Sequence, residues 1–152
     1  MLLSVAWLLC VTLNLHAQRP LTWTADNGNG TYSNPIFFDE FSDPDLIRVG
    51  NDYYLTGTTM HAMPGLPVLH STDLVNWELM SSALDRLDLG PAFRLEDGKE
   101  SYGRGIWAPS FRYHAGTFHI FSNVNGQTTQ HFTATSPRGP CSSIIAPSTG
   151  TG

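Results

Sequence analysis

The sequence has very little cysteine, and this limits its covalent and metal chemistry. Of 152 residues only two are cysteines, Cys10 and Cys141. Cys10 lies inside an apolar N-terminal run that has the character of a removable targeting segment. Without that run a single thiol remains, so the sequence excludes an intramolecular disulfide and a cysteine-based metal cluster.

Positively charged side chains are also scarce. The chain carries 8 lysines and arginines against 13 aspartates and glutamates, with a formal net charge of −5, and Lys99 is its one lysine. Nucleic acids and anionic membrane surfaces attract proteins through clustered Lys and Arg. The sequence therefore predicts neither as a partner and favours a neutral or weakly charged ligand.

Long apolar runs are confined to the N-terminus. Residues 1–17 (MLLSVAWLLCVTLNLHA) are apolar through Leu15 and end in a small residue, as in a secretory signal peptide, although the usual basic residues at the start are missing. The run is short for a membrane span. We expect cleavage after Ala17 and a secreted, periplasmic or extracellular protein; a buried N-terminal helix is the alternative.

The remaining sequence predicts an all-β protein. No segment shows sustained 3.6-residue apolar periodicity, while short runs rich in β-branched and aromatic residues alternate with turn residues. The charged, glycine-rich segment 85–105 reads as a long connection. The predicted strands are 45–49, 52–57, 67–70, 75–80, 109–114, 117–122 and 130–135.

Two of these stretches are alike. DLIRV-GN-DYYLTG (45–57) and SFRYH-AG-TFHIFS (110–122) both read as hairpins with a two-residue link that contains glycine, and each is followed by a more polar strand. Units of about four short strands are typical of β-propeller blades, and propellers have about four to eight of them. The chain is long enough for roughly two blades.

Three runs resemble glycoside hydrolase family 43, more narrowly its β-xylosidase and α-L-arabinofuranosidase members. They are YSNPIFFDEFSDPDLIRVGNDYYLTGTT, PGLPVLHSTDLVNWE and GRGIWAPSFRYHAGTFHIF, and the resemblance covers residues 32–140. It implies a five-bladed β-propeller with an axial pocket, inverting hydrolysis of plant cell-wall pentosides and a carbohydrate partner. The implied hydrolysis requires no cofactor. Residues 18–140 are thus expected to be the N-terminal part of such a propeller.

Asp43 is the candidate catalytic base. Inverting hydrolysis uses two carboxyl groups about 6.5–9.5 Å apart, one to activate water and one to protonate the leaving oxygen. The resemblance assigns the base to the aspartate directly before the proline of the first blade, which is Asp43 before Pro44. The proline is expected to hold Asp43 extended at the start of a strand. Alternatives are that Asp43 only shapes a turn, or that Asp45 is the base.

Trp107 and His61 are the candidate substrate contacts. Trp107 precedes the second hairpin and offers a face for the C–H side of a sugar, unless it packs between blades. His61 lies in a loop where the family lines its pocket, unless it is simply solvated. Trp77 is expected to pack between blades. No metal site is expected, because the spacing of the other histidines does not suggest ligands; they are His70, His114, His119 and His131.

The resemblance also implies a general-acid glutamate and a second aspartate, and neither has a match here. None of the four glutamates lies in such a motif. Residues 141–152 (CSSIIAPSTGTG) change character and are expected to be an atypical tail, the mark of a truncated and inactive hydrolase. The alternatives are a non-catalytic secreted carbohydrate-binding module and a fragment without function.

Overall fold

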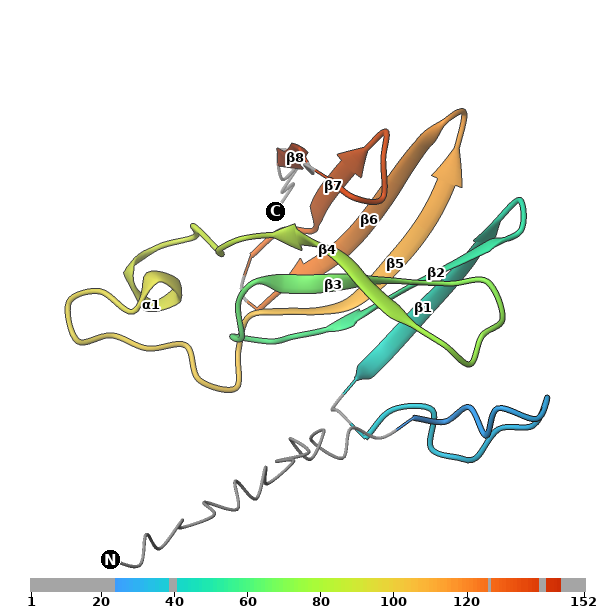
Figure 1. The fold of residues 1–152 in the computed structure, drawn as a ribbon. Helices are drawn as coiled ribbons and strands as arrows, with labels where there is room; N and C mark the ends of the chain where they lie inside the picture. Colours follow the sequence, from blue (N-terminus) through green and yellow to red (C-terminus); the bar gives the residue numbers. More distant parts are fainter. Residues whose placement is uncertain (1–23, 39–40, 126, 140–141, 146–152) are drawn as a thin grey trace, which may run out of the picture.

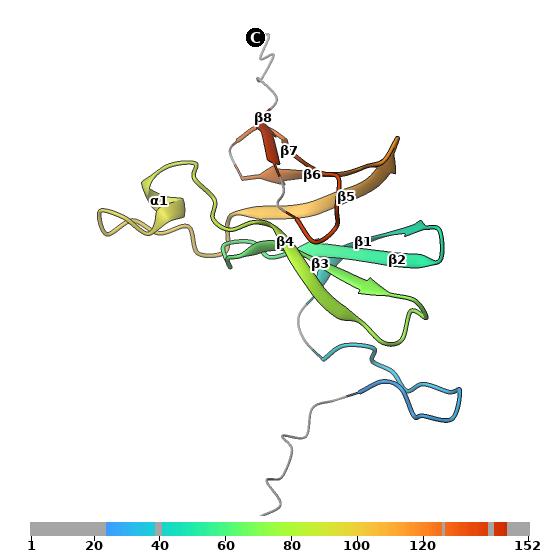
Figure 2. The same cartoon turned by 45° about the horizontal axis from the view of Figure 1, so that its top comes forward.

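The protein is built from two four-stranded antiparallel sheets. The computed structural model describes residues 24–38, 41–125, 127–139 and 142–145. The first sheet has the order β1-β2-β3-β4 and the second β5-β6-β7-β8. Figure 2 shows the second sheet lying over the first. The strand bounds are β1 Ser42–Val49, β2 Asp52–Thr58, β3 Gly65–Ser71, β4 Glu78–Leu84, β5 Ile106–His114, β6 Thr117–Val124, β7 Gln130–Ala134 and β8 Ser142–Ile145.

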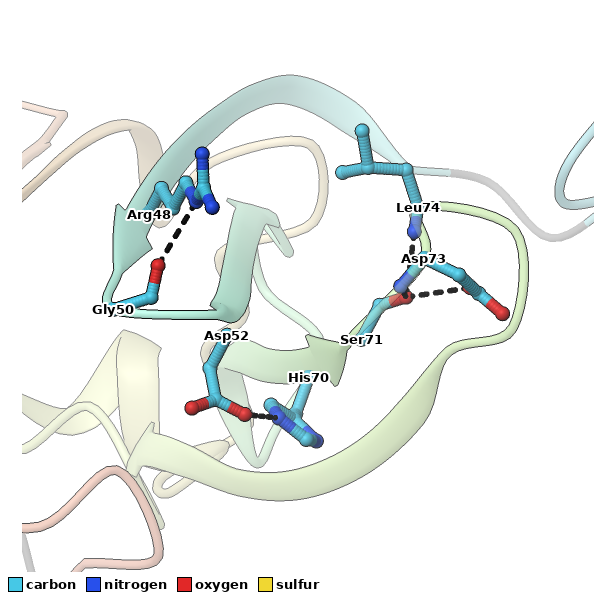
Figure 3. Close-up of polar contacts among 7 residues, drawn as sticks. All are labelled: Arg48, Gly50, Asp52, His70, Ser71, Asp73 and Leu74. Atoms are coloured by element: carbon cyan, nitrogen blue, oxygen red, sulfur yellow. Dashed lines mark hydrogen bonds and ion pairs between the residues drawn. The ribbon is translucent and has the colours of Figure 1, made fainter.

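The sequence correctly predicted the all-β class and both hairpins. In the first hairpin β1 turns into β2 through Gly50 and Asn51, with Gly50 in the left-handed region at φ 64°. Arg48 donates from its side chain to the Gly50 carbonyl at 2.9 Å (Figure 3). In the second hairpin Ala115 and Gly116 both have positive φ, as a type I′ turn requires.

The prediction for residues 75–80 was wrong in its start, because a tight turn occupies residues 71–77. The amide groups of Asp73 and Leu74 both donate to the Ser71 hydroxyl, at 3.1 and 2.8 Å (Figure 3). Side-chain and backbone hydrogen bonds from Asn76 and a backbone bond from Val75 lower the pKa of Asp73. These local bonds satisfy backbone donors that a strand would pair, so β4 begins only at Glu78.

Strand β8 was not predicted. It pairs with β7 and completes the second sheet, although its residues fall in the segment 141–152 that the sequence set apart as a tail. The sequence also placed no helix in 85–105, where the structure has a single helical turn, α1 (Pro91–Arg94). In Figure 1 this connection projects to one side of the sheets.

The hydrophobic core lies between the two sheets. Because side chains alternate along a strand, every second residue of β6 faces the first sheet. Phe111, Leu66 and Ile106 are the most completely buried large side chains. Each sheet thus buries one face against the other, as neighbouring propeller blades do. The core members are Tyr54, Leu66, Val68, Ala83, Leu87, Ile106, Phe111, Phe118, Ile120, Val124 and Phe132.

Residues 24–38 lie beside the first sheet and hold the 71–77 turn. Asn76 donates to Asp26 at 2.8 Å, and the Trp77 ring lies 6.1 Å from that of Phe37. Trp77 therefore packs on this N-terminal segment and not between the two sheets, because its turn lies at the edge of the sheet. Within the described residues no helix is long and apolar enough to span a membrane.

Candidate active site

Asp43 lies in a β-bulge at the start of β1. The pairing of β1 with β2 slips between Ser42 and Asp45, and Asp43 has φ 47°. The expectation that Pro44 holds Asp43 in an extended conformation was wrong, because the bulge places it in the left-handed region instead. That conformation is costly for a residue with a Cβ. It takes Asp43 out of the alternation of the strand and leaves its side chain exposed.

Thr58 at the end of β2 holds the Asp43 carboxylate. The Thr58 hydroxyl donates to Asp43 Oδ2 at 2.9 Å and accepts the backbone N–H of Ala108 at 2.8 Å. Ala108 belongs to β5, so one hydroxyl links the carboxylate in the first sheet to the backbone of the second. The orientation of Asp43 therefore depends on both sheets.

The second sheet repeats the bulge without the carboxylate. The pairing of β5 with β6 slips between Trp107 and Ser110, and Ala108 has φ 51° before Pro109. Asp43-Pro44 and Ala108-Pro109 thus occupy equivalent places in the two first strands. Sequence analysis missed this equivalence, although an X-Pro pair at the start of each hairpin unit was visible. Of the two bulges, only the first carries an acid.

Asp45 has a different environment. Its Oδ2 accepts the backbone N–H of Phe111 at 2.7 Å and pairs with Arg112 at 2.7 Å. Both partners lie in β5, so the half-buried Asp45 carboxylate holds the two sheets together. Asp45 Oδ2 is thus bound by two donors, one of them a charged guanidinium, and the carboxylate is less exposed than that of Asp43. This geometry favours Asp43 over Asp45 as a base.

His61 lies in the loop between β2 and β3, beside the start of β5. Its Nδ1 accepts the Gly103 N–H at 3.3 Å, and its ring centroid lies 4.8 Å from that of Tyr102. The loop is fixed because Met60 and Ile106 exchange two backbone hydrogen bonds, each 3.0 Å long. Sequence analysis missed Tyr102, because it treated the whole segment 85–105 as a connection.

A hollow of about 580 Å³ lies between this loop and the bulge of β1; we call it the inner hollow. Asp43 and Trp107 are not among its lining residues, but Ser42 and Thr58, which flank and bind Asp43, are. No acidic side chain lines it within the part of the chain that the structure describes. Its lining residues are Ser42, Thr58, Thr59, Met60, His61, Ala62, Tyr102 and Gly103.

Trp107 lies in β5 opposite Asn123, one residue before Ala108. Its side chain is 41% exposed, so it is not a member of the core between the sheets. Its carbonyl accepts the Ser122 hydroxyl at 2.8 Å, which fixes the backbone there. The structure thus places Trp107 one residue before Ala108, whose N–H binds Thr58, but gives its ring no contact with Asp43.

Metal-ligating residues do not gather in the described segments, where no group of three or more His, Cys, Asp or Glu side chains has the geometry to hold an ion. The chemistry that the site offers is that of one exposed carboxylate with a hydroxyl donor, next to a hollow lined by polar and aromatic groups. Such an arrangement can accept a proton from a water molecule, or bind a neutral polar ligand.

Comparison with known proteins identifies the family. The profile of the glycosyl hydrolases family 43 matches residues 32–150. A non-reducing end alpha-L-arabinofuranosidase of Bacteroides ovatus is 41% identical over 119 residues, which are 76% of this chain and 22% of the relative. A beta-xylosidase of Formosa agariphila is 36% identical over 96 residues, 63% of this chain and 16% of the relative. The chain thus spans about a fifth of the length of these relatives.

Solved structures of family 43 proteins also align with this chain. A bifunctional GH43-CE protein of Bacteroides eggerthii aligns with a TM-score of 0.67 and 39% identity over 73% of this chain and 15% of that chain. The GH43 protein BlXynB of Bacillus licheniformis, in a K247S mutant, aligns with a TM-score of 0.60 and 34% identity over 73% of this chain and 23% of that chain. The chain belongs to glycosyl hydrolase family 43, and its two sheets are two blades of that family's five-bladed β-propeller.

Proposed function

We propose that the protein to which this chain belongs is an inverting glycosidase that hydrolyses pentosides derived from xylan or arabinan, with Asp43 as general base. The observation that carries the proposal is the hydrogen bond from Thr58 to the exposed Asp43 carboxylate beside the inner hollow. Membership of family 43 and the names of the relatives, an arabinofuranosidase and a xylosidase, support the substrate class.

In this mechanism Asp43 removes a proton from the attacking water while a second carboxyl group protonates the leaving oxygen. Thr58 orients Asp43 by binding Oδ2, which leaves Oδ1 for the water. His61 and Tyr102 form one wall of the hollow that receives the sugar. Trp107 offers a partly exposed ring one residue from the Thr58 link, where it can pack on the C–H face of that sugar.

The test compares two neighbouring aspartates in the full-length protein. Asp43→Asn keeps the size of the side chain and an oxygen for Thr58 but removes the base, so we expect kcat to fall about 10²–10⁴-fold on xylo- or arabino-oligosaccharides. Asp45→Asn keeps an oxygen for the Phe111 N–H but removes the charge that pairs with Arg112, so we expect a lower Tm and nearly unchanged kcat. NMR of the first product formed should show an inverted anomeric centre.

A second candidate is a carbohydrate-binding protein without catalysis, favoured by the absence of an acidic side chain among the described residues that line the inner hollow. It predicts binding of xylan or arabinan without turnover, equal in wild type and Asp43→Asn. Calorimetry beside the activity assay separates the two functions. Hydrolysis that Asp43→Asn leaves intact would contradict the role of Asp43.

We also propose that the protein is exported. The signal-like residues 1–17 lie outside the described residues, so the proposal depends on their sequence alone. N-terminal sequencing of the mature protein should begin at Gln18. A mature protein that keeps Met1 would contradict export by a cleaved signal.

A further inference from the structure

A second hollow, also of about 580 Å³, adjoins the inner hollow; we call it the outer hollow. The two share His61 and Tyr102, which therefore stand between them as a common wall. The outer hollow lies against the 85–105 connection and the α1 turn, which Figure 1 shows projecting beyond the sheets. Its lining residues are His61, Met63, Arg86, Phe93, Arg94, Leu95, Glu96, Glu100, Ser101 and Tyr102.

The wall presents an aromatic surface that the core does not use. Tyr102 is 78% exposed, and its ring is held by the His61 ring, tilted by 48° at 4.8 Å. The hydrogen bond from the Gly103 N–H to His61 Nδ1 fixes the adjoining backbone to that ring. A large exposed aromatic ring with an ordered neighbour suits stacking against the apolar face of a pyranose or furanose ring.

The charges around the outer hollow cancel. Its lining includes two arginines and two glutamates. Arg94 donates to Asp88 at 2.6 Å and to Glu96 at 2.8 Å, and Arg86 donates to Asp88 at 3.0 Å. The hydrogen bond from Arg94 lowers the pKa of Asp88. Since its arginines are already paired with carboxylates, the outer hollow favours a neutral occupant over an anionic one.

The place of the outer hollow relative to Asp43 indicates which part of the substrate it would bind. The cleaved sugar must lie against Asp43, and of the two hollows only the inner one is lined by Ser42 and Thr58, which flank and bind that residue. A sugar that continues from the inner hollow past the His61–Tyr102 wall enters the outer hollow. There it meets the apolar side chains of Met63, Phe93 and Leu95 as well as Tyr102.

We propose that the outer hollow is a binding subsite for a neutral sugar of the substrate beyond the cleaved bond, and that Tyr102 is its stacking platform. This inference rests on the proposed function, because it takes Asp43 as the centre of the reaction. It makes Tyr102 a determinant of preference for oligosaccharides over substrates with a small leaving group.

The test uses the full-length protein and two kinds of substrate: neutral xylo- and arabino-oligosaccharides, and the matching glycosyl fluorides, whose leaving group is too small to reach the outer hollow. Tyr102 borders both hollows, so Tyr102→Ala should lower kcat/KM on both substrates. We expect the loss on oligosaccharides to be about tenfold greater than the loss on the fluoride, mainly through KM, because only the oligosaccharide reaches the outer hollow. Tyr102→Phe keeps the ring and should retain both values. Tyr32→Ala, at a 56% exposed tyrosine away from both hollows, is the matched control and should change neither.

Each other outcome has a distinct meaning. Equal loss on oligosaccharide and fluoride, or no loss on the oligosaccharide, would overturn the subsite while leaving the proposed function intact. If the wild-type protein hydrolyses none of these substrates, the proposed function fails and the subsite fails with it.

Discussion

At the scale of single residues, the site depends on one hydroxyl group. The Thr58 hydroxyl donates to Asp43 and accepts from the Ala108 amide. The orientation of the proposed base therefore depends on where the second sheet lies. A side chain without a hydroxyl at position 58 would leave the carboxylate free to rotate and the amide without a partner. Thr58 is therefore a positioning residue in the proposed mechanism.

We expect Thr58→Val, which has nearly the same shape, to lower kcat about tenfold with little change in KM, because the base is bound by fewer donors. Loss of the exposed hydrogen bond from the Ala108 N–H should cost about 0.5–1.5 kcal/mol of unfolding free energy. Thr58→Ser keeps the hydroxyl and should restore kcat. Steady-state kinetics with thermal unfolding checks both effects, and a Val variant with unchanged kcat would remove Thr58 from the mechanism.

At the scale of elements, the approach of the β2–β3 loop to the start of β5 fixes the wall of the hollows. Gly105 has φ 135°, and a Cβ at this position would lie 2.0 Å from the Met60 carbonyl oxygen. The neighbouring pair Met60 and Ile106 exchanges two backbone hydrogen bonds. Only glycine allows the two backbones to come this close. His61 follows Met60 directly, so the contact also positions His61.

Gly105→Ala should therefore destabilise the protein by about 3 kcal/mol, because the clash adds to the cost of the backbone conformation. The control is Gly50→Ala: Gly50 has φ 64° but open space around its missing Cβ, so it should cost only about 1 kcal/mol. Denaturant unfolding measures both. Equal losses in the two variants would show that the close approach to Met60 contributes nothing.

At the scale of the whole molecule, the described residues cover one face of the second sheet. Phe118, Ile120, Ser122 and Val124 of β6 face the first sheet. On the opposite face Phe121 is 38% exposed and its ring stacks on that of His131 with centroids 4.1 Å apart. Propeller blades are stabilised by burial against neighbours on both sides, and an uncovered sheet face with aromatic residues favours association.

A polypeptide limited to these two sheets should thus be marginally stable and should self-associate. Light scattering coupled to size-exclusion chromatography, with calorimetry, measures both properties. Replacing Phe121 with Ser should reduce association, whereas the same replacement at Phe38, which is 69% exposed outside the two sheets, should not. A monomer with a sharp, cooperative unfolding transition would contradict this prediction.

The sequence alone determined the all-β class, the two hairpins and the family. Alternating apolar residues and glycine-containing turns are local signals, and the three motifs resemble family 43 without reference to contacts. The start of β4 and the existence of β8 were not determined this way: Ser71 and Asp73 replace strand pairing with turn bonds, and β8 depends on pairing with β7.

Only the tertiary structure decided how the candidate site is built. Asp43 could be named from its proline, but its left-handed conformation, its Thr58 partner and the equivalent bulge at Ala108 depend on pairing across both sheets. Asp45 could be separated from Asp43 only once Arg112 and the Phe111 amide were seen to occupy it. Tyr102 became a site residue only through its contact with His61, 41 positions earlier in the chain. Contacts between residues distant in sequence produce no periodic pattern in the sequence. These contacts could therefore be identified only from the fold.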